Sequence, residues 1–249
     1  PGPSQVVAYR QLVGTSQVDE CDPVFKYLGE KQLLGLAEYR QRFDLAITAR
    51  EFQLARWLAK KIDQRHIDEA ALWIGAQSNP EKFLAGHTPD RDSKTYRKQL
   101  AYAAERLTYI DPVAALRLWT GVAKQYAFSR KLQRDTERHI ALWTARDGLP
   151  GGYRLLAALP RAAQDEEVMR WRARLSLRDN EWQRLLVDVA SMTAAESAQQ
   201  EWRYWRAVAL ESLGQAQEAR QEFESLSAER SYYGFLAADE IGRDYALDD

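Results

Sequence analysis

The stretch that decides the fold lies near the end of the chain. It reads Trp202-Arg203-Tyr204-Trp205, continues to Leu213-Gly214, and closes with Ser231-Tyr232-Tyr233-Gly234-Phe235-Leu236-Ala237-Ala238. Trp202, Trp205, Ala209 and Leu213 recur at helical intervals and predict one apolar stripe. Gly214 then ends the helix, because glycine adopts the left-handed conformation at little cost. The stretch predicts three consecutive helices, over 197–213, 215–228 and 231–241.

The second and third of these helices have apolar faces of their own. The faces are Ala216, Ala219, Phe223 and Leu226 in one, and Tyr233, Leu236, Ala237 and Ile241 in the other. Ala219 and Phe223 place a small residue beside a large one, which lets two helices approach closely. Ser231 is the expected N-cap of the third helix, and Gly242 is its expected end. With Leu213-Gly214, this pattern is loosely similar to the tetratricopeptide repeat.

The rest of the chain repeats this pattern of short amphipathic helices. Asp22-Pro23, Asn79-Pro80 and Asp111-Pro112 each predict an N-cap followed by proline at the first helical position. Ala71-Leu72-Trp73 recurs as Ala141-Leu142-Trp143, and Leu54-x-x-Trp57 has the apolar spacing of Leu116-x-x-Trp119. No segment alternates apolar and polar residues over the length of a strand. The other helices are expected over 5–13, 23–28, 30–47, 50–61, 64–77, 80–85, 92–109, 112–126, 130–146, 150–158, 164–177 and 179–190.

These features predict an all-α fold, namely a right-handed α-superhelix or solenoid of antiparallel helix pairs that is tetratricopeptide-like. Each pair in such an array packs on its neighbours, so 249 residues need not enclose one compact core. A hydrophobic content of 45% with eight tryptophans supplies a continuous core instead. We expect residues 1–249 to be part of one such domain within a longer protein.

Composition argues against several classes of partner. The net charge of −1 gives no whole-molecule case for binding nucleic acid or an anionic membrane. No apolar run approaches the ~18–20 residues that span a bilayer. Cys21 is the one cysteine and has no partner for an internal disulfide, so a buried or idle thiol is the expectation.

The residues that carry chemistry in other proteins do not form a known constellation here. His66, His87 and His139 lack the one-turn spacing of a helical zinc site. There is no Gly-x-Ser-x-Gly elbow, and no Gly-Lys-Ser/Thr follows the glycine-rich segment 148–152. Asp165-Glu166-Glu167 is interpreted as a helix start, where carboxylates offset the helix dipole. We therefore expect no catalytic residue, no cofactor and no metal in this chain.

Five short segments occur in one order along the chain. They are Cys21-Asp22-Pro23-Val24-Phe25, Leu54-Ala55-Arg56-Trp57-Leu58-Ala59, Trp171-Arg172-Ala173-Arg174-Leu175-Ser176-Leu177-Arg178 with Trp182, Glu201-Trp202-Arg203-Tyr204-Trp205, and Tyr232-Tyr233-Gly234-Phe235-Leu236-Ala237-Ala238. In this order and spacing, and over most of the chain, they resemble the superhelical domain of the soluble lytic murein transglycosylases.

The resemblance implies a periplasmic bacterial protein with a long, U-shaped α-superhelix, a linker domain that closes it into a ring, and a lysozyme-like catalytic domain. Members of this family cleave the bond between N-acetylmuramic acid and N-acetylglucosamine in peptidoglycan and leave a 1,6-anhydro product. Their catalytic Glu-Ser is followed by Gly-x-Met-Gln, and neither Glu196-Ser197 nor Glu224-Ser225 has that context. Residues 1–249 are thus expected to lack the linker and catalytic domains and not to be an enzyme alone.

The expected task of this chain is to scaffold the missing domains of the same protein and to guide the glycan strands of peptidoglycan. Arg170, Arg174 and Arg178 recur one helical turn apart and are candidate contacts for an anionic ligand, such as the carboxylates of peptidoglycan. The alternative is a solvated face on which Glu166 and Arg170 form an ordinary i, i+4 pair. Exposed tryptophan or tyrosine side chains would be candidates for stacking on sugar rings.

The sequence leaves two other functions open. A stand-alone helical-repeat adaptor that binds protein partners in a concave groove would show the same helical pattern. An enzyme that is complete in this chain is the third hypothesis, and the lack of a nucleophile–base or metal constellation argues against it. A downstream domain with Glu-Ser and Gly-x-Met-Gln would separate the first hypothesis from the adaptor.

Overall fold

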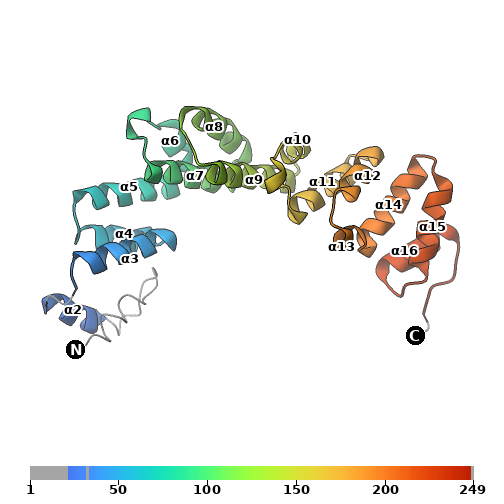
Figure 1. The fold of residues 1–249 in the computed structure, drawn as a ribbon, viewed down its shortest axis with the longest axis horizontal. Coiled ribbons are helices and arrows are strands. Elements are labelled where there is room, and N and C mark those ends of the chain that lie inside the picture. Colours follow the sequence, from blue (N-terminus) through green and yellow to red (C-terminus); the bar gives the residue numbers. More distant parts are fainter. Residues whose placement is uncertain (1–21, 32–33, 248–249) are drawn as a thin grey trace. The chain divides into compact units, whose positions relative to one another are not determined.

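The computed structural model describes residues 22–31 and 34–247, and all regular structure within these ranges is helical (Figure 1). The expected helix over 5–13 and Cys21 lie outside the described residues. The chain divides into two compact units, one formed by residues 1–110 and 114–128 and the other by residues 111–113 and 129–249. The predicted all-α fold class is confirmed in both units.

The first unit begins with α2 and ends with α8. Its helices are α2 (Asp22–Glu30), α3 (Leu36–Thr48), α4 (Phe52–Ala59), α5 (Gln64–Ser78), α6 (Pro80–Ala85), the 3₁₀ helix η2 (Pro89–Arg91), α7 (Lys94–Thr108) and α8 (Pro112–Gln125). Helices that are consecutive in sequence pack on one another, α3 on α4 and α4 on α5. Helix α5 also packs on both α6 and α7. This arrangement brings η2 and the start of α7 close to α5.

The second unit continues the same pattern. Its helices are α9 (Arg130–Arg146), α10 (Gly152–Ala157), η3 (Arg161–Ala163), α11 (Glu166–Arg178), α12 (Trp182–Ala190), α13 (Ala194–Ser197), α14 (Gln200–Ser212), α15 (Ala216–Ser227) and α16 (Tyr232–Ile241). Helix α14 packs on α12, α15 and α16, so the three predicted C-terminal helices lie side by side (Figure 1).

Side-chain caps explain where many of these helices begin. Each capping oxygen accepts a hydrogen bond from the backbone N–H three residues later, and each such cap contributes about 1 kcal/mol to helix stability. The capping residues are Asp63, Asn79, Ser93, Ser129, Asp165, Thr193 and Ser231. The predicted caps Asn79 and Ser231 are confirmed, with N···O distances of 3.2 and 3.0 Å. Gly214 and Gly242 end their helices with φ of 78° and 64°, as predicted.

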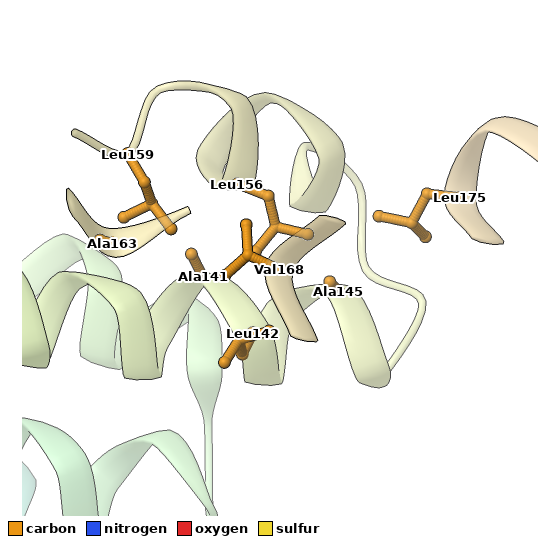
Figure 2. Packing of buried hydrophobic residues seen from close by; sticks show 8 residues of the cluster. All are labelled: Ala141, Leu142, Ala145, Leu156, Leu159, Ala163, Val168 and Leu175. Atoms are coloured by element: carbon orange, nitrogen blue, oxygen red, sulfur yellow. The ribbon is translucent and has the colours of Figure 1, made fainter. Parts of the chain in front are cut away.

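The core consists of small apolar clusters between neighbouring helices. Figure 2 shows one of them, in which Leu156 and Val168 pack over the alanines of α9. Gly152 makes this close approach possible, because a Cβ there would lie 2.9 Å from Cα of Ala145. Burying one such leucine or valine contributes about 1.5–3 kcal/mol.

The structure corrects several details of the predicted elements. The helix expected over 30–47 begins only at Leu36, after Gly35, whose N–H donates to the Glu38 carboxylate at 3.0 Å. The helix expected over 197–213 begins only at Gln200, because the extended backbone at Gln199 separates α14 from the short helix α13. Leu213, expected in the apolar stripe, is exposed because it follows the last turn of α14. Ala216, expected in the apolar face of α15, is also exposed.

Candidate ligand-binding surfaces

A groove of about 820 Å³, open to solvent, lies in the first unit where α5, η2 and α7 meet. Its volume is in the range of small-molecule sites. Arg65, Asp68 and Glu69 line it from α5, Arg91 lines it from η2, and Ser93, Lys94, Thr95, Tyr96 and Gln99 line it from α7. The groove could not be predicted from the sequence, because its residues come from separate segments and follow no motif.

The cations of the groove are Arg65, Arg91 and Lys94. Within the described part of the chain, none of the three forms an ion pair with a carboxylate. Arg97, one turn further along α7, differs from them, because its guanidinium donates to both oxygens of Asp92 at 2.6 and 2.7 Å. Arg65 has the Glu69 carboxylate near it on α5, so Arg91 and Lys94 are the cations that the groove offers to a ligand.

The inner part of the groove contains hydrogen-bond acceptors. Gln99 is only 1% exposed, and its Nε2 donates to the backbone oxygen of Glu69 at 3.2 Å. Its Oε1 is buried and has no hydrogen-bond partner among the described residues. Burial also raises the pKa of the Glu69 carboxyl. An unpaired buried acceptor costs about 1–3 kcal/mol, so a ligand that donates to Gln99 would recover that cost.

Trp57 is the one exposed tryptophan of the eight, all of which lie in the described part of the chain. Its side chain is 50% exposed, and the ammonium of Lys61 lies 5.7 Å from the ring centroid. Trp119, which has the same apolar spacing in the sequence, is buried. Their helices share a spacing, but α4 is short and presents Trp57 to solvent. Single exposed apolar residues are common, so exposure alone assigns Trp57 no ligand.

The predicted stripe of Arg170, Arg174 and Arg178 lies on α11 with 42–48% of each side chain exposed. Each guanidinium already has a carboxylate nearby. The pairs are Arg170 Nε to Glu196 Oε1 at 3.0 Å, Arg174 Nη2 to Glu201 Oε1 at 4.0 Å, and Arg178 Nε to Asp179 Oδ1 at 2.9 Å. The expected Glu166–Arg170 pair is also present, at 3.9 Å. The stripe is therefore largely neutralised by the protein itself.

The carboxylates singled out in the sequence take structural positions. Asp165 caps α11, and its pKa is held below the usual value by hydrogen bonds from Arg138 and the Val168 N–H, although burial alone would raise it. Arg138 Nη2 lies 2.8 Å from Glu167 Oε2.

Glu196 lies in the short helix α13 and is only 3% exposed, and burial raises its pKa. Arg170 is its ion-pair partner, but the geometry of that pair is not that of a hydrogen bond.

A buried polar network between α10, α11 and α12 was not predicted. Asp188 has no solvent exposure and lies 2.6 Å from Nη2 of Arg172. Ser176 Oγ donates to the second carboxylate oxygen at 2.8 Å, and the Tyr153 hydroxyl donates to the first at 3.1 Å. Arg184 donates to Ser176 Oγ at 2.9 Å and stacks over the Tyr153 ring with its Cζ 4.0 Å from the centroid. Both oxygens of the Asp188 carboxylate thus have partners within the fold, which indicates a structural role.

The histidines lie apart from one another and have local partners. His66 Nδ1 lies 2.7 Å from the Asp63 carboxylate, and His87 Nδ1 lies 3.1 Å from the Tyr126 hydroxyl. Among the described residues, no group of three or more histidine, cysteine or acidic side chains is placed to hold a metal ion. Over the same residues, no helix combines the length and apolarity needed to cross a membrane.

No protein-family model matches the chain. The soluble lytic murein transglycosylase of Escherichia coli strain K12 is 24% identical over 238 residues, which cover 95% of this chain and 37% of that protein. The enzyme of the same name from Salmonella typhimurium strain LT2 is 23% identical over the same length. This chain therefore spans little more than a third of the curated relatives it matches.

Solved structures agree with the sequence relatives. The lytic transglycosylase Slt from Pseudomonas aeruginosa, solved as an inactive mutant, matches with a TM-score of 0.76 and 26% identity over 98% of this chain and 39% of its own. The resemblance to the soluble lytic murein transglycosylases is confirmed. The 70 kDa soluble lytic transglycosylase of Escherichia coli shares the fold, with a TM-score of 0.67, 20% identity, and coverage of 97% of this chain and 40% of that one. The lytic transglycosylase superhelix is thus the fold class of this chain.

Proposed function

We propose that this chain is a non-catalytic, helical scaffold segment of a periplasmic lytic transglycosylase that acts on peptidoglycan. The supporting observation is the match to the Pseudomonas aeruginosa lytic transglycosylase, which spans 98% of this chain but only 39% of that protein. In this proposal residues 1–249 form part of one α-superhelical domain. The linker and catalytic domains of the same protein, and the cleavage to 1,6-anhydro products, belong to other parts of the polypeptide.

The scaffold would also guide glycan strands. Two kinds of surface support this part of the proposal, because peptidoglycan combines sugar rings with carboxylate-bearing peptides. Trp57 offers an exposed aromatic face beside the ammonium of Lys61. The groove of α5, η2 and α7 offers the cations Arg91 and Lys94, neither of which forms an ion pair among the described residues. The arginines of α11 are weaker candidates, since each is paired within the fold.

Co-sedimentation with purified peptidoglycan sacculi tests the proposal. We expect the chain to pellet with sacculi at low salt, to be released as salt rises because the cationic contacts are screened, and to liberate no 1,6-anhydro sugars. Anhydro sugars released by the purified chain would contradict the non-catalytic role. Failure to pellet at the lowest salt would contradict the substrate-guiding role and favour a helical-repeat adaptor for protein partners.

Substitutions locate the contact within the same assay. The variant Trp57→Ala should pellet less than the native chain if the exposed ring contacts sugar. The triple variant Arg170→Ala, Arg174→Ala and Arg178→Ala should lose less affinity than the groove variant Arg91→Ala and Lys94→Ala, since each guanidinium of α11 already has a carboxylate nearby. A loss larger than that of the groove variant would assign the anionic contact to α11.

A further inference from the structure

The start of α7 provides anion-binding groups in addition to its side chains. Ser93 caps the helix by accepting from the Tyr96 N–H at 3.0 Å. The N–H groups of Lys94 and Thr95 precede the first intrahelical acceptor, as the first amides of any α-helix do, and both residues line the groove. Together with the side chains of Arg91 and Lys94, these amides favour a carboxylate or another small anion at the mouth of the groove.

The inner side of the groove presents hydrogen-bond acceptors, in contrast to the cations and amide donors at its mouth. The unpaired Oε1 of Gln99 is a buried acceptor, and the carboxyls of Asp68 and Glu69 line the same groove from α5. One oxygen of Asp68 already accepts from Gln64 Nε2 at 2.8 Å, and Glu69 interacts with Arg65, so Gln99 is the acceptor best placed for a ligand. Gln99 therefore requires an N–H or O–H donor on the same ligand that carries the anion.

We infer that the groove between α5, η2 and α7 binds a short peptide with a free carboxylate, of the kind found in the peptide stems of peptidoglycan. A peptide supplies a carboxylate for Arg91 and Lys94 and backbone N–H donors for Gln99, which matches both sides of the groove. A neutral sugar would leave the cations unpaired, and a phosphate would leave Gln99 without a donor. The choice of peptidoglycan peptides rests on the proposed function, whereas the need for an anion next to a donor comes from the groove.

Isothermal titration calorimetry on the full chain tests this inference with a synthetic stem tetrapeptide, L-Ala–γ-D-Glu–L-Lys–D-Ala. The tetrapeptide should bind, and the same peptide with its carboxylates converted to amides should bind at least about tenfold more weakly. The double variant Arg91→Ala and Lys94→Ala should weaken binding of the free peptide by a similar factor. Both side chains are exposed, so helicity by circular dichroism should be unchanged.

A matched control comes from the same helix. Lys98 of α7 is exposed and does not line the groove, so Lys98→Ala should bind the tetrapeptide as the native chain does. If Lys98→Ala weakened tetrapeptide binding as much as the groove variant does, the effect would come from the total charge of the chain. That result would overturn the inference. Tighter binding of a peptide-free N-acetylglucosamine oligomer than of the tetrapeptide would overturn it as well.

The outcome can be separated from that of the proposed function. A chain that pellets with sacculi but does not bind the tetrapeptide would disprove the peptide groove and leave the scaffold proposal intact. A chain that binds the tetrapeptide but does not pellet would support the groove and contradict the guiding of intact strands. Binding in both assays, with both signals lowered in the Arg91→Ala and Lys94→Ala variant, is the expected result.

Discussion

At the scale of the residue, Asp188 is a carboxylate that lies inside the fold and depends on the side chains around it. It is completely buried, and its oxygens receive hydrogen bonds or an ion pair from Arg172, Ser176 and Tyr153. Removing one member of a buried ion pair leaves the other charge without compensation, which costs more than the pair itself contributes. Without Asp188, the guanidinium of Arg172, which is only 12% exposed, would be a buried charge that has lost its carboxylate partner.

Asp188→Ala should therefore lower the free energy of unfolding by about 3–5 kcal/mol, measured by urea denaturation followed by circular dichroism. Asp179→Ala is the matched control, because Asp179 pairs with Arg184 of the same network but is 37% exposed. The control should cost no more than about 1 kcal/mol. Equal losses in the two variants would show that the burial of Asp188 has no special energetic role.

Glu196 predicts a pH effect with a definite sign. Burial raises its pKa above the ordinary value, so the folded chain holds this proton more tightly than the unfolded chain does. The contribution of Glu196 to stability is then complete below the unfolded pKa and is lost as the pH rises through the folded pKa. Glu196→Gln should remove this loss, so the variant should gain stability relative to the native chain as the pH increases.

Thermal unfolding from acid to neutral pH measures that difference. Glu224→Gln serves as the control, since Glu224 is 43% exposed and forms an i, i+4 pair with Arg220. The control should follow the native chain across the range. A difference between Glu196→Gln and the native chain that stays constant with pH would contradict the assigned titration.

Single residues also show what the sequence could not reveal. The apolar spacing around Trp57 equals that around Trp119, yet one ring is exposed and the other is buried. Spacing defines a face of a helix, whereas the neighbouring helix decides whether that face is covered. The unpaired Oε1 of Gln99 could not be predicted for the same reason. It depends on the packing of α5 against α7 and not on any motif.

At the scale of the element, helix positions could be predicted well because their signals are local. The helices α6 and α9 have the bounds expected from Asn79-Pro80 and from residues 130–146. A cap, a proline at the first turn and a glycine after the last turn act within a few residues. The start of α3 and the break before α14 were missed, since Gly35 and Gln199 end one conformation and begin another without a distinctive residue pattern.

The contact between α15 and α16 depends on a glycine. A Cβ at Gly234 would lie 2.0 Å from the backbone oxygen of Glu229, so Gly234→Ala must displace the backbone. We expect it to lower the free energy of unfolding by about 1–3 kcal/mol or more. In α8, a Cβ at Gly121 would meet nothing within 4 Å, and Gly121→Ala should instead stabilise the chain by about 0.5–1 kcal/mol.

Chemical denaturation of the two variants checks the opposite signs. Both substitutions add one methyl group to a helix, so their intrinsic helix propensities change equally. Only the space around the new Cβ differs. Destabilisation by both variants, or by neither, would show that the close approach of α16 to the preceding turn is not a constraint.

At the scale of the whole molecule, helices pack mainly on the helices next to them along the chain. Such arrays have stabilities that are set locally, and a perturbation at one position spreads over its neighbours first. Hydrogen exchange should therefore be faster in Gly234→Ala for the amides of α14, α15 and α16, and unchanged for those of α3, α4 and α5. Uniform acceleration over both units would show instead that the chain opens as one cooperative body.

The exposure of Trp57 also has an optical consequence. Seven of the eight tryptophans are buried or half-buried, so Trp57 should emit furthest to the red and be the most accessible to an aqueous quencher. The ammonium of Lys61, 5.7 Å from its ring, should favour quenching by iodide over quenching by caesium. Any molecule that covers this side of α4 should shift the emission to the blue and protect it from iodide, so the chain contains its own label-free fluorescent reporter.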